Sequence, residues 1–174
     1  YVQVLVFADD IGQHQGPMLD AGMYRDFLYP CHEKLFRYVR ENSDIRIFYH
    51  TDGSILELLP HLIEAGIQIF NTVQTDAAGM DPAILKREFG KDLVFWGGGI
   101  DTHRTLPRGT PQQVREDVRR RMQVLARVAA MSFPLCIIFS ATFSRKISSR
   151  YLTPPLSTVN TRSRLQVSRW ISYR

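Results

Sequence analysis

The sequence predicts an α/β fold in which parallel strands alternate with helices. Runs rich in β-branched and aromatic residues begin at residues 2, 45, 67 and 93, which leaves room for one helix between successive strands. Each run ends in polar or glycine residues, as expected where the loops at the carboxyl ends of strands build one site. No glycine-rich nucleotide-binding signature follows any of these runs. The pattern therefore favours about four βα units of a partial (β/α)8 (TIM) barrel over a doubly wound sheet.

The strands are predicted first, because short apolar runs bounded by turn residues are the clearest signal in this chain. They are expected at 2–7, 45–49, 67–73 and 93–96. The helices are predicted from apolar residues that recur at helical spacing. They are expected at 20–42, 55–63, 81–90 and 111–125.

The ends of the predicted helices carry recognisable signals. Pro30 lies inside the first helical segment and predicts a kink or break there. Gly66 is a typical end for the second helix. Asp81 and Pro82 are a typical start for the third helix, and Thr110 opens a capping box for the fourth.

The charge of the chain is divided unevenly along its length. The formal net charge is +5, yet all 17 acidic residues lie in residues 1–125, beside 14 basic ones. Residues 126–174 contain eight basic residues and no acidic residue. We therefore treat 1–125 as a mildly acidic α/β unit and 126–174 as a basic, Ser-rich tail that we expect to be disordered.

Composition excludes several classes of protein. The chain has no apolar run of about 18 residues, so we expect no membrane partner. Cys31 and Cys136 form neither a disulfide framework nor a zinc motif, which indicates a reducing, cytoplasmic location. The basic excess belongs to the tail, so we expect a small-molecule substrate and no nucleic acid.

Candidate catalytic residues stand at the ends of the first two strands. Adjacent residues of a strand point to opposite faces, so at most one of Asp9 and Asp10 can face a site. His50 and Asp52 share a face, which suits a His base oriented by a carboxylate, or two ligands of a metal that needs a third. A His–Asp hydrogen bond that closes a turn at Gly53 is the alternative.

The fourth strand leads into a glycine run. Gly97, Gly98 and Gly99 could let a substrate approach the backbone closely, or could form a tight turn. Asp101 follows them as a further candidate. The histidines outside the strand ends are interpreted as ordinary helix or surface residues: His14, His32, His61 and His103.

Nine short motifs, in order, resemble the C-terminal half of the uroporphyrinogen decarboxylase family over residues 1–125. They are ADDIG at 8–12, YRDF at 24–27, HTDGSI at 50–55, LLP at 58–60, IEAG at 63–66, NTVQ at 71–74, AGMD at 78–81, LKREFG at 85–90 and GGIDT at 98–102. The resemblance implies a TIM-type barrel. It also implies that an N-terminal half precedes residue 1.

The resemblance implies two chemical classes. Decarboxylases of this family remove acetate-chain carboxylates from uroporphyrinogen without a cofactor. The related methyltransferases move a methyl group between a corrinoid protein and a thiol, with Zn²⁺ held by a His-x-Cys pair and a later Cys. At the equivalent place this chain has His50 and Asp52, so Asp would replace the thiolate ligand. With the resemblance, Gln74 joins the candidates as a substrate-binding residue, beside Gly98 and Gly99.

The resemblance stops near residue 125, and a shift of reading frame explains why. One choice of codons for 128–133, 136–140 and 144–148 gives, at a single offset, the family motifs GGYVF, HNIQ and PENI. We therefore expect the tail to be out-of-frame translation, which the nucleotide sequence decides. An incomplete barrel would expose strand edges, so this chain alone is expected to aggregate and to be inactive. A third interpretation makes the basic tail a module that binds anionic partners.

Overall fold

The computed structural model describes residues 1–126 of the 174-residue chain. The predictions for the tail, namely disorder, frameshifted sequence and binding of anionic partners, concern residues that lie outside the described part, apart from Ala126. Within residues 1–126, no helix has the length and apolar character needed to cross a membrane.

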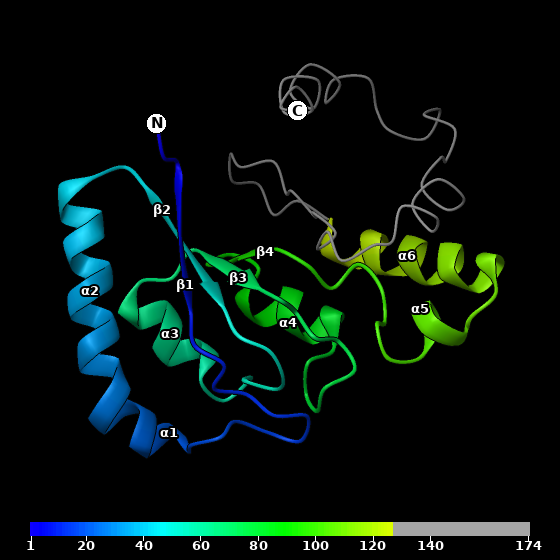
Figure 1. The fold of residues 1–174 in the computed structure, drawn as a ribbon, viewed down its shortest axis with the longest axis horizontal. Coiled ribbons are helices and arrows are strands. Elements are labelled where there is room, and N and C mark those ends of the chain that lie inside the picture. The colour runs from blue at the N-terminus through cyan, green and yellow to red at the C-terminus, as the bar shows by residue number, and fades with distance from the viewer. Residues whose placement is uncertain (127–174) are drawn as a thin grey trace. The chain divides into compact units, whose positions relative to one another are not determined.

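Four parallel strands form one sheet in the order β1-β2-β3-β4 (Figure 1). Helices alternate with these strands along the chain. The α/β class and the succession of βα units predicted from the sequence are therefore confirmed, as a partial TIM barrel. The strands are β1 (Val4–Ala8), β2 (Arg46–His50), β3 (Ile69–Asn71) and β4 (Val94–Phe95).

Three of the four predicted helical segments begin within one residue of their predicted starts. The first segment is divided just before Pro30, where a π-helical turn meets a regular helix, so the predicted break is present. The second helix starts later than its apolar pattern suggests, because Pro60 stands in its first turn, where a missing N–H costs nothing. The elements are α1 (Ala21–Met23), η1 (Tyr24–Leu28), α2 (Tyr29–Asn42), α3 (Leu59–Ala65), α4 (Pro82–Phe89), α5 (Thr105–Arg108) and α6 (Pro111–Leu125).

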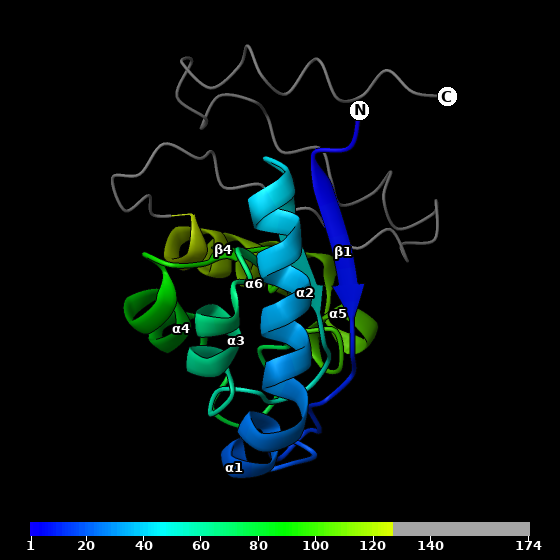
Figure 2. The same cartoon turned by 90° about the vertical axis from the view of Figure 1, so that its left-hand side faces the viewer.

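The core lies between the sheet and the helices. Alternate strand residues point toward the helices and are fully buried there, as Tyr49, Phe70 and Phe95 show. They pack with apolar residues of the helices, among them Phe36 of α2 and Leu62 of α3. Figure 2 shows α2 and α3 side by side over this face of the sheet.

The other face of the sheet carries a second set of residues in register. Val6, Phe48, Ile69 and Val94 form an apolar row across all four strands. Two residues further toward the carboxyl ends, the same face carries a row that includes His50 and Asn71. The sheet therefore changes from apolar to polar at its carboxyl edge, which is where the candidate site lies.

Candidate functional site

Asp10, His50 and Asp52 come together at the carboxyl edge of β1 and β2. Their potential ligand atoms all lie within 4.8 Å of one another. Nε2 of His50 lies 3.7 Å from Oδ1 of Asp10, which also accepts the backbone N–H of Asp52 at 3.1 Å. The His50 side chain is 31% exposed and that of Asp10 64%, so the cluster is open to a ligand.

Asn71 fixes the orientation of the His50 ring. The Nδ2 group of Asn71 donates to the carbonyl oxygen of Trp96 at 2.6 Å, which turns Oδ1 toward His50. Oδ1 can only accept, so Nδ1 of His50 carries the proton and donates it across 2.6 Å. In the neutral ring, Nε2 is therefore left as a lone pair that faces Asp10.

The carboxylate of Asp52 is held by the next loop. Its Oδ1 accepts the hydroxyl of Thr72 at 2.9 Å, and among the described residues it has no hydrogen bond with His50. The alternative of a His–Asp hydrogen bond that closes the turn is therefore not what the structure shows. Gly53, at φ +80°, takes the left-handed conformation that the turn needs.

Gln74 links the loops that follow β2 and β3. Its Oε1 accepts the backbone N–H of Gly53 at 2.9 Å. Between Asn71 and Gln74, Val73 has a φ of +58°, a strained conformation for a β-branched residue. Strain of this kind is concentrated at functional sites, where the surrounding structure enforces it. Gln74 thus lies at the candidate site, where it positions a loop.

Asp9 points to the opposite side of β1 from Asp10. Its Oδ2 lies 3.1 Å from Nε2 of His32 on α2, a residue that is only 8% exposed. Burial raises the pKa of the Tyr24 phenol, with smaller contributions from Tyr29 and Asp9, so this phenol keeps its proton. The Tyr24 hydroxyl therefore donates a hydrogen bond to Nδ1 of His32 at 2.9 Å. The proton of the neutral His32 ring is then on Nε2, which donates a hydrogen bond to Asp9.

His32 is a residue that the sequence interpretation set aside as an ordinary helix residue. A signal was available, because Leu28 and Phe36 flank it at a spacing of four residues and place it on the apolar face of the helix. A histidine on a buried face needs polar partners from elsewhere in the fold. Which groups those are depends on tertiary contacts.

Asp101 lies apart from the Asp10–His50–Asp52 cluster. Its Oδ1 accepts the backbone N–H groups of His103 and Arg104, at 2.9 and 2.8 Å. His103 in turn lies 2.8 Å from the carboxylate of Asp76, and Asp76, Asp101 and His103 form a second group of potential metal ligands. The structure thus gives Asp101 a role in capping a turn.

The glycines after β4 let the chain pass close to β3. Gly97 has a φ of +129°, and a Cβ atom there would collide with the carbonyl group of Thr72. Gly98, at φ +68°, packs against Val73 and Leu125. For Gly97 and Gly98, these contacts favour the tight-turn alternative. Gly99 lies in the same loop, at the carboxyl edge of the sheet, and its role in binding a substrate stays a prediction.

Comparison with known proteins places this architecture in a family. No curated protein and no solved structure matches the chain. The model of the family described as uroporphyrinogen decarboxylase (URO-D) matches residues 1–132, which is most of the chain and extends past residue 125. Four βα units with a polar carboxyl edge and a family match over the same residues lead to one conclusion: the chain belongs to the uroporphyrinogen decarboxylase family.

Proposed function

We propose that the Asp10–His50–Asp52 cluster performs decarboxylase-type acid–base chemistry on a porphyrinogen or a related polycarboxylate. The observation that carries the proposal is the orientation of His50 by Asn71, which presents Nε2 beside two carboxylates. A group so held can exchange protons with a substrate at one defined atom. The incomplete barrel led us to expect an inactive chain. Because the described residues supply all three side chains of the cluster, we propose instead that the chain retains slow turnover.

The chemistry follows from the bond that breaks. When a carboxylate leaves as carbon dioxide, the electron pair of the C–C bond stays on the substrate, whose carbon then takes up a proton. Protonated His50 supplies that proton from Nε2, while Nδ1–H continues to donate a hydrogen bond to Asn71. Asp10 and Asp52 stabilise the imidazolium before the transfer, as anions a few ångströms away do.

The test is decarboxylation of uroporphyrinogen under anaerobic conditions with the full chain at a concentration above that of the substrate. We expect slow release of carbon dioxide, and loss of most of that rate in His50→Gln. His14→Gln is the matched control, because His14 is an exposed histidine outside the cluster. Unchanged substrate, or equal rates for the wild type and His50→Gln, would refute the proposal.

A second candidate function is zinc-dependent methyl transfer to or from a corrinoid protein. Sequence spacing supplied two potential ligands, His50 and Asp52, and the fold adds Asp10 as a third. One nitrogen and two carboxylates fit a catalytic zinc site with an open position, and Asn71 provides the outer hydrogen bond that a ligating histidine usually has. A zinc ion held there would lower the pKa of a bound thiol.

Metal titration separates the two functions. The full chain is titrated with Zn²⁺ in competition with a chromophoric chelator, beside His50→Ala and His14→Ala. Methyl transfer requires one equivalent of tightly bound zinc that is lost in His50→Ala alone. Binding that is absent, or equal in all three proteins, excludes this candidate and leaves the decarboxylase chemistry.

A further inference from the structure

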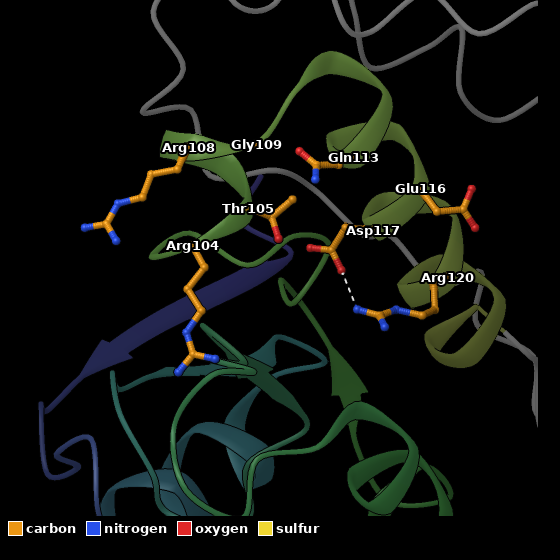
Figure 3. A pocket seen from close by; sticks show the side chains of 8 residues that line it. All are labelled: Arg104, Thr105, Arg108, Gly109, Gln113, Glu116, Asp117 and Arg120. Carbon is orange, nitrogen blue, oxygen red and sulfur yellow. Dashed lines mark hydrogen bonds and ion pairs between the residues drawn. The ribbon is translucent and has the colours of Figure 1, made fainter.

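A basic groove of about 560 Å³ lies between α5 and the first turns of α6. Figure 3 shows side chains from both helices around it. The loop that carries α5 follows β4, so the groove and the candidate site both belong to loops at the carboxyl ends of strands. The polar and basic residues that line the groove include Arg104, Thr105, Arg108, Gln113 and Arg120.

The carboxylates at this groove are already neutralised. Glu116 pairs with Arg119 at 2.8 Å. Asp117 pairs with both Arg120 and Arg121 at 2.9 Å and is only 5% exposed. Both carboxylates that line the groove are therefore paired with arginines of α6.

Two guanidinium groups at the groove have no counter-charge within residues 1–126. The side chains of Arg104 and Arg108 make no hydrogen bond or ion pair with any residue that the structure describes. They stand four residues apart, one at the N-cap of α5 and one at its end, and Figure 3 shows their side chains extending in different directions. A ligand with several separate carboxylates can therefore pair with both. Arginine is suited to such an anion, because its planar group binds a carboxylate through two parallel hydrogen bonds.

A series of polar contacts connects the helices of the groove to the loops of the candidate site. The backbone N–H of Asp101 donates to Asp117 at 3.0 Å, which ties the α5 loop to α6. His103 pairs with Asp76 of the loop after β3. The same loop carries Gln74, which bonds Gly53 beside His50 and Asp52.

The groove region and the candidate site differ in charge. Residues 101–126 contain six arginines and three acidic residues, whereas the candidate site contains Asp10 and Asp52. Carboxylate groups of a substrate would be repelled by that pair. A polycarboxylate that reacts at His50 therefore needs cations elsewhere for the carboxylates that do not react.

We propose that the groove binds the peripheral carboxylates of a polycarboxylate substrate, with Arg104 and Arg108 as the ligands. This inference rests on the proposed function and names the substrate contacts that go with it. Binding energy from these remote carboxylates would hold the reacting side chain at His50.

The test uses uroporphyrin, the oxidised octacarboxylate, which binds without reacting and is fluorescent. Its anisotropy is followed as the full chain is added. Arg104→Gln/Arg108→Gln is expected to weaken binding about tenfold or more, since each lost contact is a charge-assisted hydrogen bond. Arg104→Lys/Arg108→Lys, which keeps both charges, should recover part of that loss.

The control removes the same charge elsewhere. Lys91→Gln/Arg115→Gln changes two exposed residues outside the groove and leaves the basic tail in place. Equal weakening in the two glutamine double variants would assign binding to overall charge and overturn the inference. Absence of uroporphyrin binding by the wild type would overturn it as well.

The outcome for the groove is distinguishable from that for the reaction. His50→Gln should keep uroporphyrin affinity and lose only turnover. If the arginine variant alone loses binding while the wild type never decarboxylates uroporphyrinogen, the groove stands and the proposed function fails. If turnover occurs with the same KM in the arginine double variant, the proposed function stands and the groove fails.

Discussion

Nε2 of His32, a residue of α2, lies 3.1 Å from the carboxylate of Asp9, which directly follows β1. Together with the Tyr24 hydroxyl, this contact ties the end of β1 to the helix layer on one side. Asp10, the next residue, is tied to the loop after β2 on the other side. The peptide that carries Asp10 is thus held from both faces, so His32 acts as a positioning residue for the cluster.

Removing the Tyr24 hydroxyl tests how much this arrangement stabilises the fold. Tyr24→Phe leaves Nδ1 of the buried His32 without a partner, and we expect the free energy of unfolding to fall by about 1–3 kcal/mol. Urea unfolding followed by circular dichroism measures it.

Tyr38→Phe is the matched control, because Tyr38 is 67% exposed and lies on α2, the helix that carries His32. Its unfolding midpoint should stay close to that of the wild type. If Tyr24→Phe also unfolds at the wild-type midpoint, the Tyr24–His32 hydrogen bond contributes nothing to stability and the positioning argument loses its support.

Asp117 gives the α5–α6 region a defined response to acid. Burial raises the pKa of this carboxyl, but hydrogen bonds from the Asp101 N–H, Arg120 and Arg121 outweigh burial and hold the pKa below its usual value. The charged form therefore stabilises the fold fully above the unfolded pKa of about 3.9. That stability is lost as the pH falls through the lower, folded pKa.

Asp117→Asn should remove this pH dependence and, at pH 7, should destabilise the chain by about 3 kcal/mol, because Arg121 stays buried without its counter-charge. Unfolding by urea at pH 7, 4 and 3 measures both effects. Glu116→Gln breaks the neighbouring exposed pair with Arg119 and should leave stability unchanged. Similar curves for both variants would show that the buried pair has no special role.

The sequence predicted the architecture because each strand carries its own local signal. The runs at 45–49 and 93–96 differ from β2 and β4 by only one residue at each end. The helix at 111–125 matches α6, since Thr110 and Gln113 form the capping box with local contacts alone. In contrast, α5 has four residues, too few for an apolar period to be visible.

The candidate site was only partly predictable, for a similar reason. His50 and Asp52 share a face by strand periodicity, and the same rule separates Asp9 from Asp10. Asn71 lay inside a recognised motif, yet its contact with His50 depends on the register of β2 against β3. The partner of a buried polar group comes from another element of the fold, which spacing along the chain does not reveal.

The orientation of Asn71 predicts which nitrogen of His50 carries the proton in the neutral ring. Because Oδ1 of Asn71 faces the ring, the neutral form should be protonated at Nδ1, whereas His32 should be protonated at Nε2. The ¹⁵N chemical shifts of the labelled imidazoles distinguish these two tautomers. Spectra are recorded at a pH where both rings are neutral.

Asn71→Ala removes the acceptor, so the shifts of His50 should move toward those of a ring protonated at Nε2 and those of His32 should not change. Asn42→Ala is the control, because the side chain of Asn42 donates to the Tyr38 carbonyl at the end of α2 and, among the described residues, makes no hydrogen bond with either histidine. A wild-type His50 already protonated at Nε2 would contradict the geometry. Nε2 would then have no lone pair facing Asp10. Both functions proposed for the cluster would lose their support, because proton uptake and zinc ligation at Nε2 each require that lone pair.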